Sequence, residues 1–155
     1  MDNDLKKHVI DNGCYSREEN LRIYDRFFSN SPRYVFRAVD KKFGISNKQI
    51  CDVGCSYGFN LIHARKDSYG IEMEPDYANF ANSLGLKVYQ KNLYEDISEL
   101  PKVDVVWCSA VLEHVEAPHN FLRRLSSLLK PNGLVVVYVP TIPLVPSLKI
   151  IRPLE

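Results

Sequence analysis

Apolar residues in this chain fall into two patterns, short continuous runs and segments in which they recur every three or four positions. The continuous runs predict five strands, at 49–53, 67–72, 87–89, 103–108 and 134–139. Helices are expected between them at 60–64, 75–85 and from Pro118 onward. Apolar strands that alternate with helices are typical of a parallel sheet covered on both faces. We therefore predict an α/β, doubly wound, mainly parallel sheet, with its ligand crevice at the carboxyl ends of the strands beside the first one.

Two more helices are predicted before the first strand. Ser16 and Glu19 fit the S-x-x-E capping box, which marks the start of a helix. Ser31-Pro32 resembles an N-cap followed by proline at the first helical position, and Gly44 is a stop signal for that second helix. The first of these helices has apolar residues on one face, namely Leu21, Tyr24, Phe27 and Phe28.

The bulk composition is that of one globular domain. Of the 155 residues, 45% are hydrophobic and 25% are charged, and the formal net charge is +1. A basic face able to neutralise phosphates is not evident, so we expect no nucleic-acid partner. The polar N-terminus and the absence of a long apolar run predict neither a signal peptide nor a membrane span.

The four cysteines show no C-x-x-C pair and no metal-ligand spacing with histidine. Cys51 and Cys108 lie within apolar runs, which is typical of buried reduced thiols. We expect a cytoplasmic protein without a metal site.

The segment ICDVGCSYGFN, at 50–60, contains G-x-S-x-G and allows three interpretations. In a serine hydrolase this pattern is the nucleophile elbow, and Ser56, Asp104 and His114 or His119 occur in the required order. Against this interpretation, the elbow follows the first strand, and no HGGG-type segment supplies an oxyanion hole.

A nicotinamide dinucleotide site is the second interpretation, but it needs G-x-G-x-x-G, and Phe59 occupies the place of the third glycine. The third is a glycine turn that brings backbone N–H groups against a nucleoside. Glu72 ends the next strand, eighteen residues after Gly54, where a carboxylate can accept both ribose hydroxyls. This third interpretation accounts for more residues than the other two.

Five stretches in order extend the third interpretation: DVGCSYG, GIEMEP, NLYED, VVWCSAVLEHVEAP and FLRRLSSLLKPNGLVVVYVP. Together they resemble the successive motifs of class I S-adenosylmethionine-dependent methyltransferases, nearest to the small-molecule, type 11/23-like subfamily. The resemblance covers residues 50–140. It implies a Rossmann-like methyltransferase fold, with S-adenosylmethionine as cofactor and S-adenosylhomocysteine as product.

The resemblance also assigns roles to the glycine turn. It implies that Asp52 anchors the turn and reaches the methionine amine, directly or through water. Gly54 and Gly58 would bring the backbone against the methionine and ribose portion, and Cys55 and Ser56 would supply backbone contacts.

Further roles follow from the next two motifs. The resemblance implies that Glu72 holds the ribose and that Met73 packs on the adenine. Asn92 and the backbone of Leu93 stand at the adenine edge, where many relatives carry aspartate in place of Asn92.

Residues after the fourth strand are expected near the acceptor. By resemblance, Ser109 and Ala110 lie beside the transferable methyl group. His114 is either a general base or substrate contact, or a residue that makes a supporting hydrogen bond while Glu113 caps the next segment. The segment lacks the signatures of nucleic-acid-methylating enzymes, so the expected acceptor is a small molecule, lipid or sugar.

The resemblance implies one domain in three parts. Residues 1–48 are expected to form a helical segment that covers the cofactor cleft, 49–140 the cofactor-binding core, and 141–155 a proline-rich tail. The family's sheet normally ends in an antiparallel strand pair, for which the tail is too short. Leu154-Glu155 is typical of a cloning remnant, so the chain is either truncated or naturally short.

The last predicted strand would then be an apolar edge, which we expect the tail or a second copy of the chain to cover, the latter as a homodimer.

Two functions stay open: a methyltransferase, or a cofactor-binding or interaction module with this fold and little catalysis.

Overall fold

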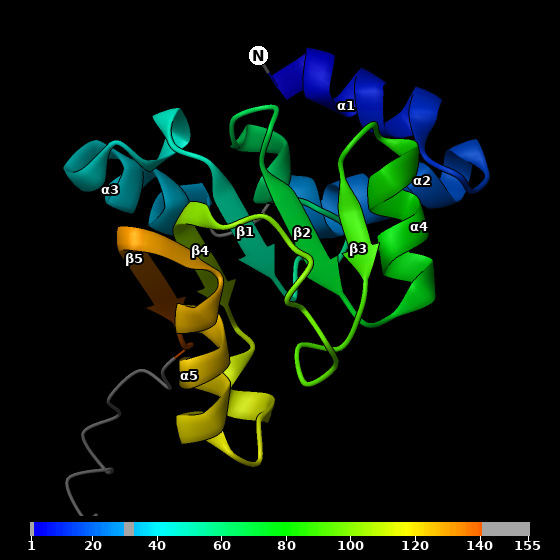
Figure 1. The fold of residues 1–155 in the computed structure, drawn as a ribbon. Helices are drawn as coiled ribbons and strands as arrows, with labels where there is room; N and C mark the ends of the chain where they lie inside the picture. The colour runs from blue at the N-terminus through cyan, green and yellow to red at the C-terminus, as the bar shows by residue number, and fades with distance from the viewer. Residues whose placement is uncertain (1, 30–32, 141–155) are drawn as a thin grey trace, which may run out of the picture.

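The computed structural model describes residues 2–29 and 33–140 and contains a five-stranded sheet (Figure 1). All strand pairs are parallel, and the strand order is β3-β2-β1-β4-β5. The strands are β1 (Ile50–Val53), β2 (Tyr69–Glu72), β3 (Val88–Gln90), β4 (Val103–Ser109) and β5 (Leu129–Tyr138). The predicted doubly wound parallel sheet is confirmed, and its order reverses between β1 and β4, where a crevice was expected.

Helices precede and connect the strands. The longer ones are α1 (Asp2–Asn12), α2 (Arg17–Ile23), α3 (Arg33–Phe43), α4 (Pro75–Ser83) and α5 (Pro118–Ser127). A π-helix, η1 (Tyr24–Phe28), continues α2. The short 3-10 turns are η2 (Ile45–Asn47), η3 (Leu61–His63) and η4 (Leu112–His114). The predicted N-cap is present at α2, where the Ser16 hydroxyl accepts from the Glu19 N–H at 3.2 Å.

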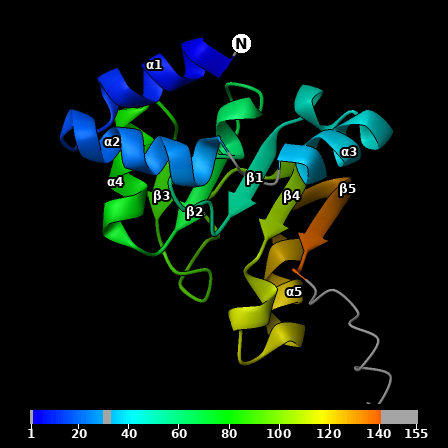
Figure 2. The same ribbon diagram turned by 180° about the vertical axis from the view of Figure 1, so that it is seen from behind.

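Helix α1 was not predicted, because only scattered positions of this polar segment are apolar. Its Val9 is nonetheless fully buried, in a cluster with Ile23 and Phe28 of the following helices and Phe80 of α4. Burial of one apolar stripe against neighbouring helices stabilises a segment whose own pattern is weak. Figure 2 shows α2 crossing the sheet on the side of β1, β2 and β3.

Both faces of the sheet are covered, as the apolar strands predicted. On one face, Val106 of β4 packs in a cluster with Phe121 and Leu125 of α5. On the other face, Trp107 meets Phe36 of α3, with ring centroids 5.2 Å apart. The strands position the site, because their carboxyl ends meet at one edge between these two layers.

Strand β5 differs from its predicted bounds. The last strand was predicted at 134–139, but β5 already begins at Leu129 and contains the turn-like segment Pro131-Asn132-Gly133. The pairing shifts from Val103↔Leu129 to Val105↔Leu134, and Asn132 has a φ of 63°. The extra residues bulge out of the ladder, which a sequence pattern of turn residues does not distinguish from a turn. The tail expected to cover β5 lies outside the described residues.

Candidate functional site

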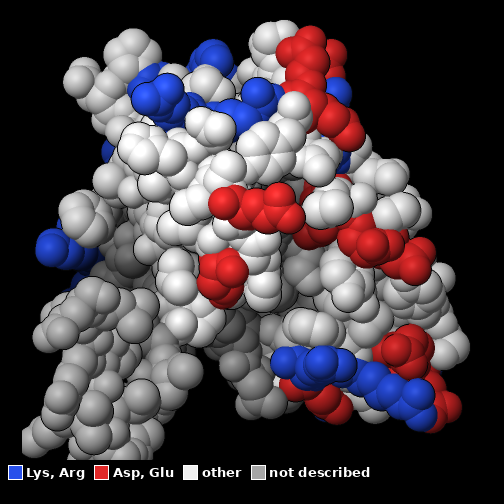
Figure 3. Space-filling model, turned by 90° about the horizontal axis from the view of Figure 1, so that it is seen from below, with Lys and Arg blue, Asp and Glu red and all other residues white. Residues whose placement is uncertain are grey.

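A cavity of about 550 Å³ lies at the carboxyl ends of the strands. Four segments line it: the end of β1 with Gly54, the end of β2 with Met73, the loop 91–94, and 110–117 together with Phe121. Figure 3 looks at this end of the molecule, whose surface is hollowed and carries acidic side chains across its middle. The cavity is therefore at the crevice position that the strand order predicts.

The glycine turn after β1 holds its backbone in left-handed conformations. Gly54, Ser56 and Gly58 have φ values of 69°, 49° and 84°. The Gly54 N–H donates to the Ile71 carbonyl at 2.8 Å, which ties the turn to β2. A Cβ on Gly54 would lie only 2.5 Å from Cγ2 of Val111, across the cavity wall. The turn thus needs glycine at Gly54 for both its conformation and the close approach.

Glu72 braces this turn from the end of β2. Its side chain lines the cavity and only 7% of its surface is exposed. One carboxylate oxygen accepts from the Ser56 N–H at 2.8 Å, and the other from the Glu74 N–H at 2.9 Å. An ionised carboxylate has about four acceptor positions, so Glu72 can still accept two hydroxyl protons. The sequence indicated its place at the cavity but not this bracing contact.

Asp52 is buried beneath the turn and does not line the cavity. It is 2% exposed, and none of the described residues hydrogen-bonds its Oδ2 atom. Burial, and next the negative charge of Glu72, raise the pKa of Asp52 to about 8. The side chain is therefore protonated near neutral pH, and a cation beside it, such as the amine or sulfonium of S-adenosylmethionine, would favour its ionised form.

The structure brings most of the predicted site residues to one cavity. Those that line it are Gly54, Glu72, Met73, Asn92, Leu93, Ala110 and His114. The predicted residues that do not line it are Asp52, Cys55, Ser56, Gly58 and Ser109. Cys55 is turned away, because its side chain packs over Gly70, where a Cβ would lie 2.5 Å from the sulfur.

Asn92 shapes the loop that follows β3. Its side-chain oxygen accepts from the Tyr94 N–H at 3.0 Å, and its backbone carbonyl accepts from the Glu95 N–H at 3.0 Å. Leu93 is buried in the core, whereas Met73 on the neighbouring wall is 66% exposed. The Asn92 amide oxygen therefore fixes the turn, which the sequence interpretation did not anticipate.

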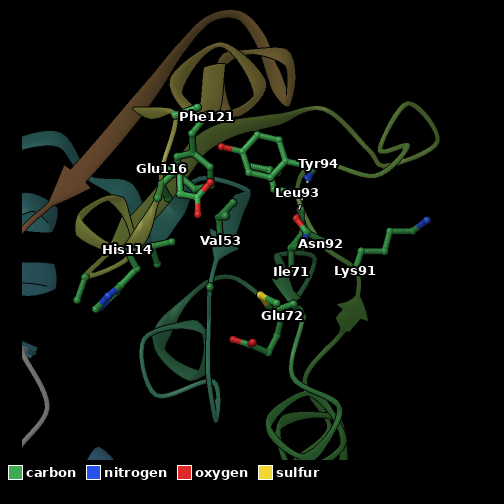
Figure 4. A pocket seen from close by; sticks show the side chains of 16 residues that line it. Val53, Ile71, Glu72, Lys91, Asn92, Leu93, Tyr94, His114, Glu116 and Phe121 are labelled. Atoms are coloured by element: carbon green, nitrogen blue, oxygen red, sulfur yellow. Dashed lines mark hydrogen bonds between the residues drawn. The ribbon is translucent and has the colours of Figure 1, made fainter. Parts of the chain in front are cut away.

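His114 lies at the rim of the cavity and points away from Asn92 and Tyr94 (Figure 4). It is exposed, and no described residue hydrogen-bonds its imidazole. The alternative role suggested for Glu113 is wrong, because α5 begins after Ala117 without any side-chain cap.

The hydrolase interpretation is also excluded by geometry. Asp104 accepts from the Gln49 N–H and from Lys130 Nζ, each at 3.0 Å, at the amino end of β1. Ser56 follows the other end of the same strand, so the proposed acid and nucleophile lie at opposite edges of the sheet.

Several cavity residues were missed by the sequence interpretation. Tyr94, Glu116 and Phe121 belong to three different segments and meet only in the folded chain (Figure 4). Lys91 contributes its stem, since its ammonium group lies 2.9 Å from Glu99 and extends away from the cavity. Glu72 and Glu116 thus leave the lining acidic, which suits a cationic ligand.

The fold and this cavity define a Rossmann-like protein whose ligand site lies at the switch point of a parallel sheet. The family model described as "Methyltransferase domain" matches residues 17–150. The chain belongs to the class I S-adenosylmethionine-dependent methyltransferases.

Curated relatives point to the same family. A ubiquinone biosynthesis O-methyltransferase of Colwellia psychrerythraea is 31% identical over 125 residues, covering 74% of this chain and 50% of the relative. The enzyme of the same name from Rickettsia typhi is 29% identical over 146 residues, covering 86% of this chain and 58% of the relative. The chain spans about half the length of these relatives.

Solved structures share the fold. The sugar N-methyltransferase KedS8 from Streptoalloteichus has a TM-score of 0.63 at 20% identity, covering 84% of this chain and 56% of that one. The plantazolicin methyltransferase BpumL, solved in complex with a monoazolic desmethylPZN analog and SAH, has a TM-score of 0.59 at 17% identity, covering 88% of this chain and 57% of that one.

Two observations concern residues 2–29 and 33–140. No helix among them is long and apolar enough to span a membrane. Nor do residues 2–29 and 33–140 contain a group of three or more potential metal ligands from His, Cys, Asp and Glu.

Proposed function

We propose that this chain is an S-adenosylmethionine-dependent methyltransferase that acts on a small-molecule, lipid or sugar acceptor. The observation that carries the proposal is the pairing of Glu72 with the glycine turn at one cavity. A buried carboxylate there keeps free acceptor positions beside a backbone that approaches without side chains. This arrangement suits the ribose and the sulfonium-linked methionine end of the cofactor.

The residues at the turn would divide the work of binding. We assign the ribose hydroxyls to Glu72 and the amine to Asp52, directly or through water. Gly54 and Gly58 provide the close approach, while Cys55 and Ser56 contribute backbone groups.

The other walls would hold the base and the reacting group. Met73 packs on the adenine, and Asn92 with Leu93 meets its edge. Ser109 and Ala110 flank the methyl group. When bound, S-adenosylmethionine supplies an electrophilic methyl on its sulfonium, so the protein has mainly to orient the acceptor and exclude water.

His114 is the proposed base. A hydroxyl acceptor, as the O-methyltransferase names of the relatives suggest, would need to lose its proton, and an exposed histidine at the rim can take it.

Residues 1–48 are proposed to cover the cleft above 49–140. The cytoplasmic location and a homodimer through the edge of β5 stay predictions; sedimentation velocity tests the latter.

One observation favours the second candidate, a cofactor-binding module with little catalysis. Six of the residues that line the cavity are assigned to the cofactor, whereas His114 is the single lining residue assigned to the acceptor.

Calorimetry with S-adenosylmethionine, S-adenosylhomocysteine and NAD tests the proposal. Both sulfur ligands should bind, and NAD should not. Glu72→Gln should weaken both by tenfold or more, since each ribose hydroxyl loses a charged acceptor. Glu74→Gln is the matched control, because Glu74 is exposed and does not line the cavity.

A folded protein that gives no heat with either sulfur ligand would refute both candidate functions. If binding is found, labelled cofactor incubated with phenols, sugars and lipids separates the enzyme from the module.

A further inference from the structure

Arg124 of α5 hydrogen-bonds the wall of the cavity that is formed by the loop after β3. Its Nε donates to the Leu93 carbonyl, and its terminal NH2 group donates to the Glu95 carbonyl. Its guanidinium also lies 6.0 Å from the centroid of the Tyr94 ring. Arg124 is half-buried in these contacts, whereas the adjacent Arg123 is exposed. A single guanidinium thus contacts three consecutive residues of the loop.

The same short turn is closed from within by Asn92. Its side chain and its carbonyl accept the Tyr94 and Glu95 N–H groups, as described above. The turn is therefore held on its inner side by Asn92 and on its outer side by Arg124. The Tyr94 ring also lies against α5, 6.2 Å from Phe121.

This double attachment matters because Asn92 and Leu93 are the residues proposed to meet the edge of the base. Hydrogen bonds to a base distinguish donors from acceptors only when the protein groups keep a fixed spacing. A planar guanidinium can donate to two carbonyls at once in a fixed geometry, which an ammonium group cannot reproduce.

We propose that Arg124 is a positioning residue that fixes the turn 92–95 against α5 and thereby makes the site selective for adenine. The inference rests on the proposed function. It concerns a residue that does not line the cavity and that acts through the backbone of the turn.

Calorimetry with S-adenosylhomocysteine and S-inosylhomocysteine tests the proposal. The second ligand has a 6-oxo purine in place of adenine, so a hydrogen-bond acceptor replaces the donor at that position of the base edge. The wild-type protein should bind S-adenosylhomocysteine at least tenfold more tightly than S-inosylhomocysteine. Arg124→Met, which keeps the stem and removes the donors, should weaken the adenosyl ligand about tenfold and reduce the preference to less than about threefold. Arg123→Met should change neither the affinity for S-adenosylhomocysteine nor the preference over S-inosylhomocysteine.

An Arg124→Met protein that keeps the wild-type preference, or a wild-type protein that binds the two ligands equally, overturns the inference. Equal weakening of both ligands with a lowered melting temperature indicates a merely structural role and also overturns it. If Arg124→Met does not fold, Arg124→Lys is tested for the same loss of preference. Absence of any binding by the folded wild-type protein refutes the proposed function itself, and the inference with it.

Discussion

The Asp52 side chain combines nearly complete burial with a carboxylate oxygen that no described residue hydrogen-bonds. On the neighbouring strand its register partner is Trp107, the single tryptophan of the chain, whose Nε1 likewise has no partner among residues 2–29 and 33–140. Parallel partners on adjacent strands are close enough for the indole fluorescence to respond to the charge of Asp52.

We predict an unusual pH dependence of stability from Asp52. Its pKa rises from 3.8 to about 8 on folding, so between these values the folded state holds a proton that the unfolded state has lost. The stabilisation is complete below about pH 4 and is lost as the pH rises through 8, with a slope of up to about 1.4 kcal/mol per pH unit. Urea unfolding of Asp52→Asn from pH 5.5 to 8 should show this slope removed.

Asp104→Asn is the control for that experiment. The Gln49 N–H, and next Lys130, lower the pKa of Asp104, so this group stays ionised throughout the measured range. Asp104→Asn should therefore keep the wild-type slope. Identical slopes in the wild-type and Asp52→Asn proteins would contradict the assignment of a proton to Asp52.

Gly54→Ala is expected to abolish tight binding of S-adenosylhomocysteine and to destabilise the fold by about 2 kcal/mol. Positive φ strains alanine there, and its Cβ would lie 2.5 Å from Val111. Gly85→Ala is the matched control for backbone strain, because the φ of Gly85 is +79° but a Cβ there meets nothing within 4 Å. Calorimetry and thermal unfolding of both variants should show destabilisation in each and lost binding only in Gly54→Ala.

At the scale of elements, the N-terminal helices are part of the core rather than an appendage. Phe27 of η1 contacts Tyr57 of the glycine turn, with ring centroids 4.8 Å apart, and Tyr57 in turn contacts Phe80 of α4. Tyr24 is 4% exposed and packs in this cluster. The helices therefore pack against the glycine turn through aromatic contacts.

Phe28→Ala should reduce the free energy of unfolding by about 3–5 kcal/mol, because it removes a ring that is only 1% exposed. Phe43→Ala, at a site 47% exposed, should cost less than about 1 kcal/mol. Urea denaturation measures both. Equal effects would show that η1 does not contribute to the cooperative core.

Element bounds were predictable where the signal is local and failed where it is not. The capping box at Ser16 and the proline at the start of α4 set helix starts through their own backbone chemistry. Helix α1 depends on burial of Val9 against distant helices, and the bulge in β5 depends on its pairing with β4. Such partners are chosen by the fold, so the local pattern does not contain them.

At the scale of the whole molecule, four segments separated by up to about sixty residues converge on one cavity. The sequence placed Gly54 and Glu72 there because parallel strands bring their carboxyl ends to a common edge, and it placed Asn92 there through the family resemblance. It did not identify Tyr94, Phe121 or the role of Arg124, because these depend on how the loop after β3 packs against α5.

The sequence by itself determined the alternation of strands and helices, the parallel sheet and the family, since these follow from periodicity and from motifs in fixed order. The tertiary structure alone decided that the Glu72 carboxylate braces the glycine turn and that Asp52 is buried without a partner. It also decided which helix holds the cavity wall. The physical reason is that burial, desolvation and hydrogen-bond pairing are properties of neighbours in space, which chain position does not specify.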